Sequence, residues 1–199
     1  MNQSQTIAVD IVLLPPREAM EQIIAINKNT PAWGPLALDD YLPHLSLAIG
    51  CIAKERMGEL REAVASITRG FSPIPVALFE ICFVERSSGG KNYALRAQKT
   101  RELQKLHEDL MRGLTGLFSE DAARASVYAD PGEEVSEPDY VADFGAQYSF
   151  ASFDPHVTLR NKEEPACELP IAFTASDVTA CHIGEMVTCR KKLFSVPLG

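Results

Sequence analysis

Two short segments of the chain share one five-residue pattern, and this repeat constrains the fold more than any other feature. Residues 43–47 read Pro-His-Leu-Ser-Leu, and residues 155–159, which start 112 positions later, read Pro-His-Val-Thr-Leu. Each segment has a histidine and a hydroxyl residue two positions apart. The chain holds only four histidines, so two such matches are rare by chance. The repeat therefore predicts two similar halves, each with one histidine-bearing strand.

The runs around the two segments support this division. Twice along the chain, a predicted strand and a predicted helix come before a histidine-bearing strand. The predicted strands span 6–14, 44–52, 74–84, 91–97, 150–161, 171–183 and 186–196, and the predicted helices span 15–27, 54–69 and 100–118. The strands at 74–84 and 91–97 form a predicted hairpin. Elements in this order predict an α+β fold.

An acidic segment lies between the two motifs, within the second half. Residues 119–146 are interrupted by Pro131, Gly132 and Pro138, so they predict a long loop, with at most a short helix at 120–125. Residues 129–145 contain six acidic residues and no Lys or Arg, which accounts for most of the net charge of −8. Tight binding of long nucleic acid needs clustered basic residues. We therefore expect no long double-stranded nucleic acid as a partner, whereas a small anion or an RNA end stays allowed.

The cysteines bear on the compartment. They number five and include no C-x-x-C pair, and three of them lie in apolar runs, where a free thiol behaves as a small hydrophobe. This usage favours a reducing compartment, the cytoplasm. Cys181, His182 and Cys189 come nearest to a metal cluster, but neighbours in a strand point to opposite faces, so we expect no metal there. The apolar run at 7–14 is too short for a membrane span.

The spacing within each segment suits acid–base chemistry. Residues two apart on a strand share a face, so His44 lies beside Ser46, and His156 lies beside Thr158. If the two strands face each other, two imidazoles and two hydroxyls meet in one cleft. Phosphodiester hydrolysis needs a base for water and an acid for the leaving oxygen, and histidine can serve as either near neutral pH. The scheme requires no metal and no cofactor.

Other residues could contribute to such a site. Arg160 is four residues beyond His156, so we expect it on the same face, where a guanidinium could neutralise phosphate charge. The corresponding residue of the first segment is Ala48, which makes the pair asymmetric. Trp33 and Tyr41 could line the mouth of the cleft, although packing within their loop is the favoured interpretation. His107 lies beside a leucine stripe, a position that predicts a solvated or boundary histidine.

The two segments resemble the paired motifs of the two-histidine phosphoesterase superfamily, and in particular its 2'-5' RNA ligase-like cyclic phosphodiesterases. PHLSLAIG resembles the first motif, and PHVTLR resembles the second, arginine included. The resemblance implies a single bilobal domain over 1–199, with two antiparallel sheets facing across a central cleft and helices outside. It also implies hydrolysis of 2',3'-cyclic phosphates or 2'-5' linkages of nucleotides or RNA ends. The implied catalytic residues are His44, Ser46, His156 and Thr158.

The resemblance leaves several points open. Tyr93 lies where relatives carry an aromatic residue that could stack on a base, but it also suits an ordinary sheet position. The gap between the motifs is long because of the acidic segment, which would repel a long anionic strand if it covers the cleft. A monomer is expected. The alternatives are a non-catalytic module that binds a nucleotide or phosphorylated metabolite, and RNA ligation by the reverse reaction.

Overall fold

The computed structural model describes residues 6–27, 35–85, 91–119, 126–133, 139–161 and 163–199. The strands are β1 (Thr6–Leu13), β2 (Leu45–Ala53), β3 (Ile74–Glu85), β4 (Lys91–Ala97), β5 (His156–Thr158), β6 (Ile171–Ala175), β7 (Asp177–Gly184) and β8 (Thr188–Pro197). The α-helices are α1 (Arg17–Ile26), α2 (Met57–Thr68), α3 (Arg101–Leu114) and α4 (Asp139–Gln147). Short 3-10 turns lie at η1 (Lys54–Arg56), η3 (Phe150–Ser152) and η4 (Glu185–Val187).

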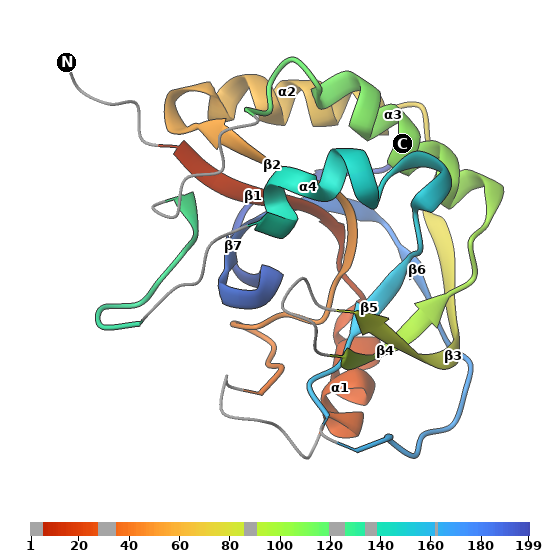
Figure 1. The fold of residues 1–199 in the computed structure, drawn as a ribbon. Helices are drawn as coiled ribbons and strands as arrows, with labels where there is room; N and C mark the ends of the chain where they lie inside the picture. Colours follow the sequence, from red (N-terminus) through yellow and green to blue (C-terminus); the bar gives the residue numbers. More distant parts are fainter. Residues whose placement is uncertain (1–5, 28–34, 86–90, 120–125, 134–138, 162) are drawn as a thin grey trace.

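The strands form two antiparallel sheets of four strands each (Figure 1). The first has the order β2-β1-β7-β8, and the second has the order β5-β4-β3-β6. The two motif strands, β2 and β5, are each at the edge of their own sheet, and they contact each other. The predicted α+β fold with two antiparallel sheets and two lobes is therefore confirmed.

The first sheet is built around β1, which is buried along nearly its whole length because β2 and β7 flank it. Its run of Ile, Ala, Val and Leu suits a strand that is covered on both faces. Asp10 is the one charged residue within β1, and it is fully buried. A buried carboxyl in such a strand is costly unless it has a partner, so its surroundings bear on the site.

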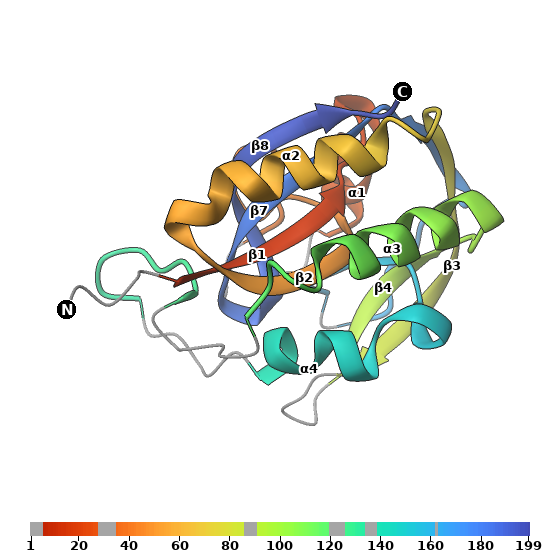
Figure 2. The ribbon, with the colours of Figure 1, turned by 90° about the horizontal axis from the view of Figure 1, so that it is seen from above.

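The helices cover the sheets from outside. In Figure 2, α2 lies along the first sheet and runs beside α3, and α4 lies beneath β2 in this view. Helix α3 shows why such segments become helices: Leu103, Leu106, Leu110 and Leu114 form one fully buried stripe. The Thr100 side chain caps this helix by accepting a hydrogen bond from the Leu103 amide at 3.2 Å. Helix α1 packs against β6 of the second sheet.

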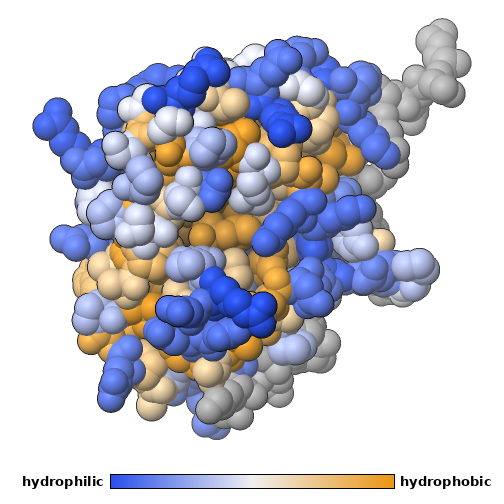
Figure 3. Space-filling model, turned by 180° about the vertical axis from the view of Figure 1, so that it is seen from behind, coloured by the Kyte–Doolittle hydropathy of each residue, from blue (hydrophilic) through white to orange (hydrophobic). Residues whose placement is uncertain are grey.

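The surface is mixed in character. On the face opposite to that of Figure 1, charged and polar residues surround a middle region where apolar atoms show through (Figure 3). The large apolar side chains that are exposed in the described residues are Phe79, Phe83 and Phe150. No helix in the described part of the chain combines the length and the apolar character that a membrane crossing needs.

Two predicted strands differ from those observed. The strand predicted at 171–183 is divided at Ser176 into β6 and β7, which belong to different sheets. The run carries no Pro or Gly at the break, so its periodicity does not reveal the change of sheet. The strand predicted at 150–161 contains only the three residues of β5, because its first part forms η3 and Phe150 has a positive φ of 54°.

The acidic segment differs most from the prediction. Helix α4 occupies the end of residues 119–146, for which the sequence predicts a loop, and continues to Gln147, and it packs against β2. Its apolar residues Tyr140, Val141 and Phe144 lie on one helical face, a pattern that the surrounding acids conceal. The short helix predicted at 120–125 lies outside the described residues.

His107 also differs from its prediction. It is fully buried rather than solvated, and its ring stacks on Phe153 with centroids 3.9 Å apart. Its Nδ1–H donates to the Leu47 carbonyl at 2.6 Å, and its Nε2 accepts from the Phe150 amide at 2.7 Å. Burial lowers the pKa of this imidazole. His107 is thus a structural, neutral histidine that joins α3 to β2 and η3.

Candidate active site

One cavity of about 450 Å³ lies between the two sheets. The predicted catalytic and phosphate-binding residues all line it, namely His44, Ser46, His156, Thr158 and Arg160. Tyr93 does not line it, but its ring packs against Phe83, which does, with centroids 4.6 Å apart. The structure thus brings two motifs that are 112 residues apart in sequence to a single site.

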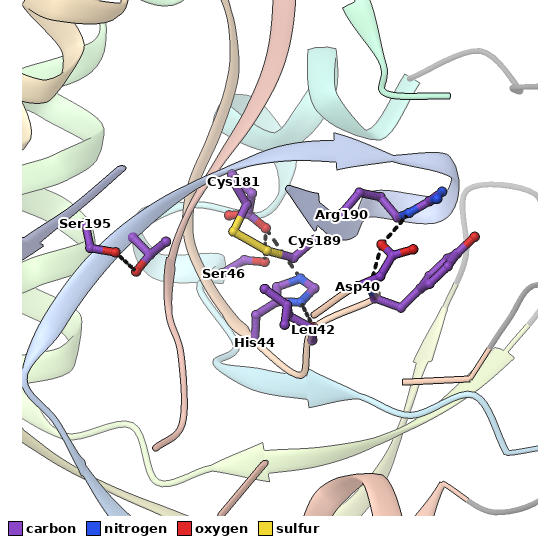
Figure 4. Close-up of a disulfide and its surroundings, with 11 residues drawn as sticks. Asp40, Leu42, His44, Ser46, Cys181, Cys189, Arg190 and Ser195 are labelled. Atoms are coloured by element: carbon purple, nitrogen blue, oxygen red, sulfur yellow. Dashed lines mark hydrogen bonds and ion pairs between the residues drawn. A yellow bond between two sulfur atoms is a disulfide. The ribbon is translucent and has the colours of Figure 1, made fainter. Parts of the chain in front are cut away.

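His44 is held from its backbone side. It directly precedes β2, and its Nδ1 lies 2.7 Å from the Leu42 carbonyl oxygen (Figure 4). A carbonyl can only accept, so Nδ1 carries the proton and Nε2 carries the lone pair in the neutral ring. The Leu42 amide in turn donates to the carbonyl of Cys189 on β8 at 2.9 Å. The edge of the first sheet thereby fixes the orientation of this imidazole.

A buried carboxyl lies beneath the first motif. The register between β1 and β2 shifts between Ile11 and Val12, so Ser46 pairs with Val12 and shares a face with Asp10. The Ser46 hydroxyl donates to Asp10 Oδ2 at 2.6 Å, and His44 Nε2 lies 3.6 Å from the same oxygen. Asp10 Oδ1 has no hydrogen-bond partner in the described part of the chain. Burial raises the pKa of Asp10 well above its usual value, and the Ser46 hydrogen bond opposes this rise.

The second motif has the same backbone arrangement. His156 pairs with Arg96 and Thr158 pairs with Ala94 in the ladder between β5 and β4. His156 Nδ1 lies 2.7 Å from the Asp154 carbonyl oxygen, two residues earlier, as His44 does with Leu42. The Asp154 carboxylate is bound by the Arg96 guanidinium at 3.1 Å. In the neutral state, both rings therefore present Nε2 as the free lone pair.

The electrostatics of the two rings are coupled. Burial lowers the pKa of His44 to about 4; the hydrogen bond to Leu42 opposes this, and the charges of His156 and Arg160 add to it. Burial also lowers the pKa of His156, against the hydrogen bond and the charge of Asp154. Because the charge of one ring affects the other, the two imidazoles share one electrostatic environment. Two such rings can divide the roles of base and acid at a single substrate.

Arg160 lies just beyond β5 rather than within it, and it still lines the cavity. It is 8% exposed, and its backbone amide donates to Asn27 Oδ1 at 2.6 Å. Its guanidinium lies over the ring of Tyr41, 4.5 Å from the centroid. Tyr41 lines the cavity, whereas Trp33 lies outside the described residues. A planar cation at this position suits a phosphate oxygen.

A second arginine organises the acidic residues near the cavity. The Arg190 side chain is 2% exposed and makes ion pairs with Asp40 at 2.7 Å, Asp130 at 2.5 Å and Glu133 at 3.1 Å. Figure 4 shows its contact with Asp40. Its guanidinium lies 4.1 Å from the centroid of the Tyr41 ring, which also contacts Arg160. We call Arg190 and these three acids the Arg190 cluster. The cluster thereby links Asp130 and Glu133 of the acidic segment to Tyr41, which lines the cavity.

Aromatic side chains that the sequence did not single out form another part of the wall. Tyr140, Phe144 and Tyr148, in and just beyond α4, line the cavity together with Phe83 from β3. Tyr140 and Tyr148 have ring centroids 4.5 Å apart. Burial raises the pKa of Tyr140, and the charge of Asp10 adds to the rise. The helical spacing of these aromatic residues is the signal that could have revealed them.

The prediction of free cysteines is wrong for one pair. Cys181 and Cys189 form a disulfide between β7 and β8, and Cys189 lines the cavity (Figure 4). Cys51, Cys82 and Cys167 are free. The sequence argument for a cytoplasmic protein assumed free thiols, and the disulfide removes that support. The cytoplasmic location stays a prediction. The two sulfurs considered as metal ligands are thus bonded to each other.

Within the described residues, no group of three or more His, Cys, Asp or Glu side chains is placed to hold a metal ion. The cavity offers two imidazoles, the hydroxyls of the two motifs and one guanidinium, beside the carboxyl groups of Asp154 and Glu185. These groups can exchange protons, donate hydrogen bonds and balance one negative charge.

No protein-family model matches the chain, and no curated protein matches it. Solved structures do match. LigT of E. coli complexed with NADP+ has a TM-score of 0.59 at 20% identity and covers 98% of this chain and 99% of its own. LigT has also been solved with 3'-AMP. A crystal structure described as a phosphoesterase has a TM-score of 0.58 at 19% identity and covers 98% of this chain and 99% of its own.

A protein of Thermus thermophilus has a TM-score of 0.63 at 17% identity and covers 96% of this chain and 98% of its own. The matches extend over nearly the whole chain. Sequence identities this low show a shared fold and nothing more. The predicted resemblance is confirmed at that level. The chain has the fold of E. coli LigT.

Proposed function

We propose that this protein is a metal-independent phosphodiesterase that hydrolyses a 2',3'-cyclic phosphate or a 2'-5' phosphodiester of a nucleotide. One observation carries the proposal: both His-x-Ser/Thr pairs line one cavity, and each imidazole is bound to a carbonyl through Nδ1. Both Nε2 atoms are thereby available for proton transfer. The LigT structures with NADP+ and 3'-AMP support a nucleotide as the ligand.

In the proposed mechanism, His44 is the base. Its lowered pKa of about 4 leaves Nε2 unprotonated at neutral pH, so it can take a proton from water as the oxygen attacks phosphorus. The protonated His156 then gives its Nε2 proton to the leaving oxygen as the phosphorus–oxygen bond breaks. After the reaction His44 carries one more proton and His156 carries one fewer. A proton transfer through solvent then returns both rings to their starting states.

Arg160 and Thr158 would hold the non-bridging oxygens, the first by charge and the second by its hydroxyl. Ser46 differs, because its hydroxyl hydrogen is directed to Asp10 rather than into the cavity. Ser46 would therefore act by holding Asp10 beside His44. In this proposal the Thr158 hydroxyl binds the phosphate, whereas the Ser46 hydroxyl positions Asp10.

The test is an assay of nucleoside 2',3'-cyclic phosphates with purified protein, with and without EDTA. We expect turnover that EDTA does not change. His44→Ala and His156→Ala should each lower kcat by about a hundred- to ten-thousandfold, the usual contribution of one acid or base. His182→Ala is the matched control, because His182 does not line the cavity and its Nε2 lies 3.0 Å from the Ser126 carbonyl oxygen.

Three outcomes would count against the proposal. Loss of turnover in EDTA would contradict the proposed independence from metal. Full activity in either alanine variant would remove that histidine from the mechanism. Saturable binding of the nucleotide with no product would instead favour a binding module on the same fold.

A further inference from the structure

Resting on the function proposed above, we propose that the cavity takes a cyclic phosphodiester of mononucleotide size and excludes RNA ends. The aromatic group of the substrate would lie against the side chains of α4. Two features of this chain carry the inference: the aromatic wall that α4 adds, and the charge around the mouth of the cavity. The wall is formed by the end of the acidic segment and the residues directly after it, and two of the three acids, Asp130 and Glu133, belong to that segment.

The dimensions agree with a small ligand. A volume of about 450 Å³ lies at the lower end of the usual range for small-molecule pockets, roughly 300–1,000 Å³. Helix α4 packs against β2, the strand that follows His44, so it closes the side of the cavity next to the first motif. A ligand at the histidines therefore lies within reach of α4.

The wall from α4 is apolar and firmly packed. Phe144 is 3% exposed and Val141 is 6% exposed, and both still line the cavity. The Tyr140 ring lies 5.9 Å from Phe144 and 4.5 Å from Tyr148, centroid to centroid. Aromatic rings stack on nucleobases without regard to sequence, because every base has a π face. This wall therefore suits one base or a comparable flat apolar group.

The lining offers one cation to a phosphate. Arg160 is the one Lys or Arg among the described residues that line the cavity, and the acids Asp154 and Glu185 line it as well. A cyclic phosphodiester carries a single negative charge, which one guanidinium can balance. An RNA end brings a further negative charge with every nucleotide, and binding it needs several cations along its path. The described lining does not provide them.

The Arg190 cluster strengthens this discrimination. One guanidinium faces three carboxylates, which leaves two negative charges, and the acids are 24% to 55% exposed. The cluster adjoins the cavity directly, because Arg190 contacts the ring of Tyr41, which lines the cavity, and because Cys189, the neighbour of Arg190, lines it too. A strand leaving the cavity on this side would meet negative potential. Salt screens such repulsion over about 8 Å at physiological strength.

The first experiment compares kcat/KM for adenosine 2',3'-cyclic phosphate with kcat/KM for an RNA octamer that ends in the same group. We expect at least a hundredfold preference for the mononucleotide at low salt, and a smaller preference at 0.5 M NaCl. Equal or better turnover of the octamer would overturn the inference. If neither is turned over, calorimetric affinities decide: tighter binding of the mononucleotide keeps the inference without the activity, and equal binding overturns it.

The second experiment tests the acidic residues. Asp130→Asn with Glu133→Gln removes two charges of the Arg190 cluster and keeps side chains of similar shape. We expect kcat/KM for the octamer to rise about tenfold and that for the mononucleotide to change less than twofold. Arg17→Gln is the control, since it alters an exposed charge that pairs with Glu21 on α1. An unchanged octamer value would overturn the part assigned to the cluster.

The third experiment tests the aromatic wall. Tyr140→Leu should raise KM for the cyclic nucleotide about tenfold with little change in kcat. Tyr140→Phe, which retains the ring, should raise KM much less. Glycerol 1,2-cyclic phosphate has no aromatic group, so its KM should differ little between the two variants. Equal effects of both substitutions on both substrates would overturn the role of α4 in binding the base.

Discussion

The two histidine motifs share their backbone geometry and differ in their surroundings. Each imidazole is bound through Nδ1 to the carbonyl two residues earlier. His44, however, has the buried carboxyl of Asp10 beneath it and is 14% exposed, whereas His156 lies beside the ion pair of the exposed Asp154 and the half-buried Arg96. The two similar halves thus give both imidazoles the same orientation. The neighbouring residues of each imidazole determine its pKa.

This difference suggests a division of labour. Burial and nearby positive charge favour the neutral form of His44, as a base requires. The charge of Asp154 favours the protonated form of His156, as an acid requires, although burial lowers its pKa overall. Equal geometry therefore does not imply equal roles.

The largest expected effect depends on the leaving group. If His156 is the acid, His156→Ala should lower kcat by about a thousandfold with an alkoxide leaving group and by about tenfold with 4-nitrophenolate, which leaves without a proton. His44→Ala should lower both equally, because attack by water still needs a base. Steady-state kinetics on the two substrates measures this. The opposite pattern would exchange the two roles.

A second expectation concerns pH. His44 must be unprotonated, so kcat/KM should fall as the pH drops through about 4. His156 must be protonated, so kcat/KM should fall as the pH rises through its pKa, which lies below the usual 6.5. The profile is then a bell with its maximum between about pH 4 and 6.5, and activity at pH 8 should be at least tenfold below the maximum. A maximum near pH 8 would contradict the lowered pKa of His156.

A smaller effect is expected from Asp10→Asn. The amide can donate to His44 Nε2 and occupy its lone pair, so kcat should fall about tenfold. The thermal stability of the variant, in contrast, should rise at neutral pH. The raised pKa of Asp10 means that its contribution to folding is present below its unfolded value and is lost as the pH rises through the folded value. The variant should therefore have a higher Tm than the parent at pH 7 to 8, and little difference near pH 3.

Ser46→Ala is the matched control for that variant. It keeps the carboxyl but removes its hydrogen-bond donor, so the unfolding free energy should fall by about 1–3 kcal/mol, the cost of a buried acceptor without a partner. Thermal melts and kinetics on both variants give the comparison. If Asp10→Asn lowers Tm at neutral pH, the carboxyl stabilises the fold and the destabilising effect assigned to its burial is wrong.

The sequence could predict the part of the site that depends on strands. Five matched residue classes located both motifs, and alternation placed His44 with Ser46 and His156 with Thr158. The order of elements was enough for the α+β class, because most runs carried a clear period. Arg160 was found from its spacing, although β5 ends before it.

The rest depended on tertiary contacts. Asp10 stands in an apolar run, and only the register shift beside Val12 brings it under Ser46. Helix α4 was concealed because its composition is acidic while one face is apolar. The disulfide depends on the pairing of β7 with β8, which brings Cys181 close to Cys189, and a count of cysteines does not contain that register.

The central claim is that both histidines act on one phosphorus atom. A crystal structure of the protein soaked with 3'-AMP, at pH 5.5, tests it most directly. We predict a phosphate between β2 and β5, with an oxygen within hydrogen-bond distance of Nε2 of His44, another within that distance of Nε2 of His156, and Arg160 in contact. A phosphate bound to one imidazole only, or bound outside the cavity, would contradict it.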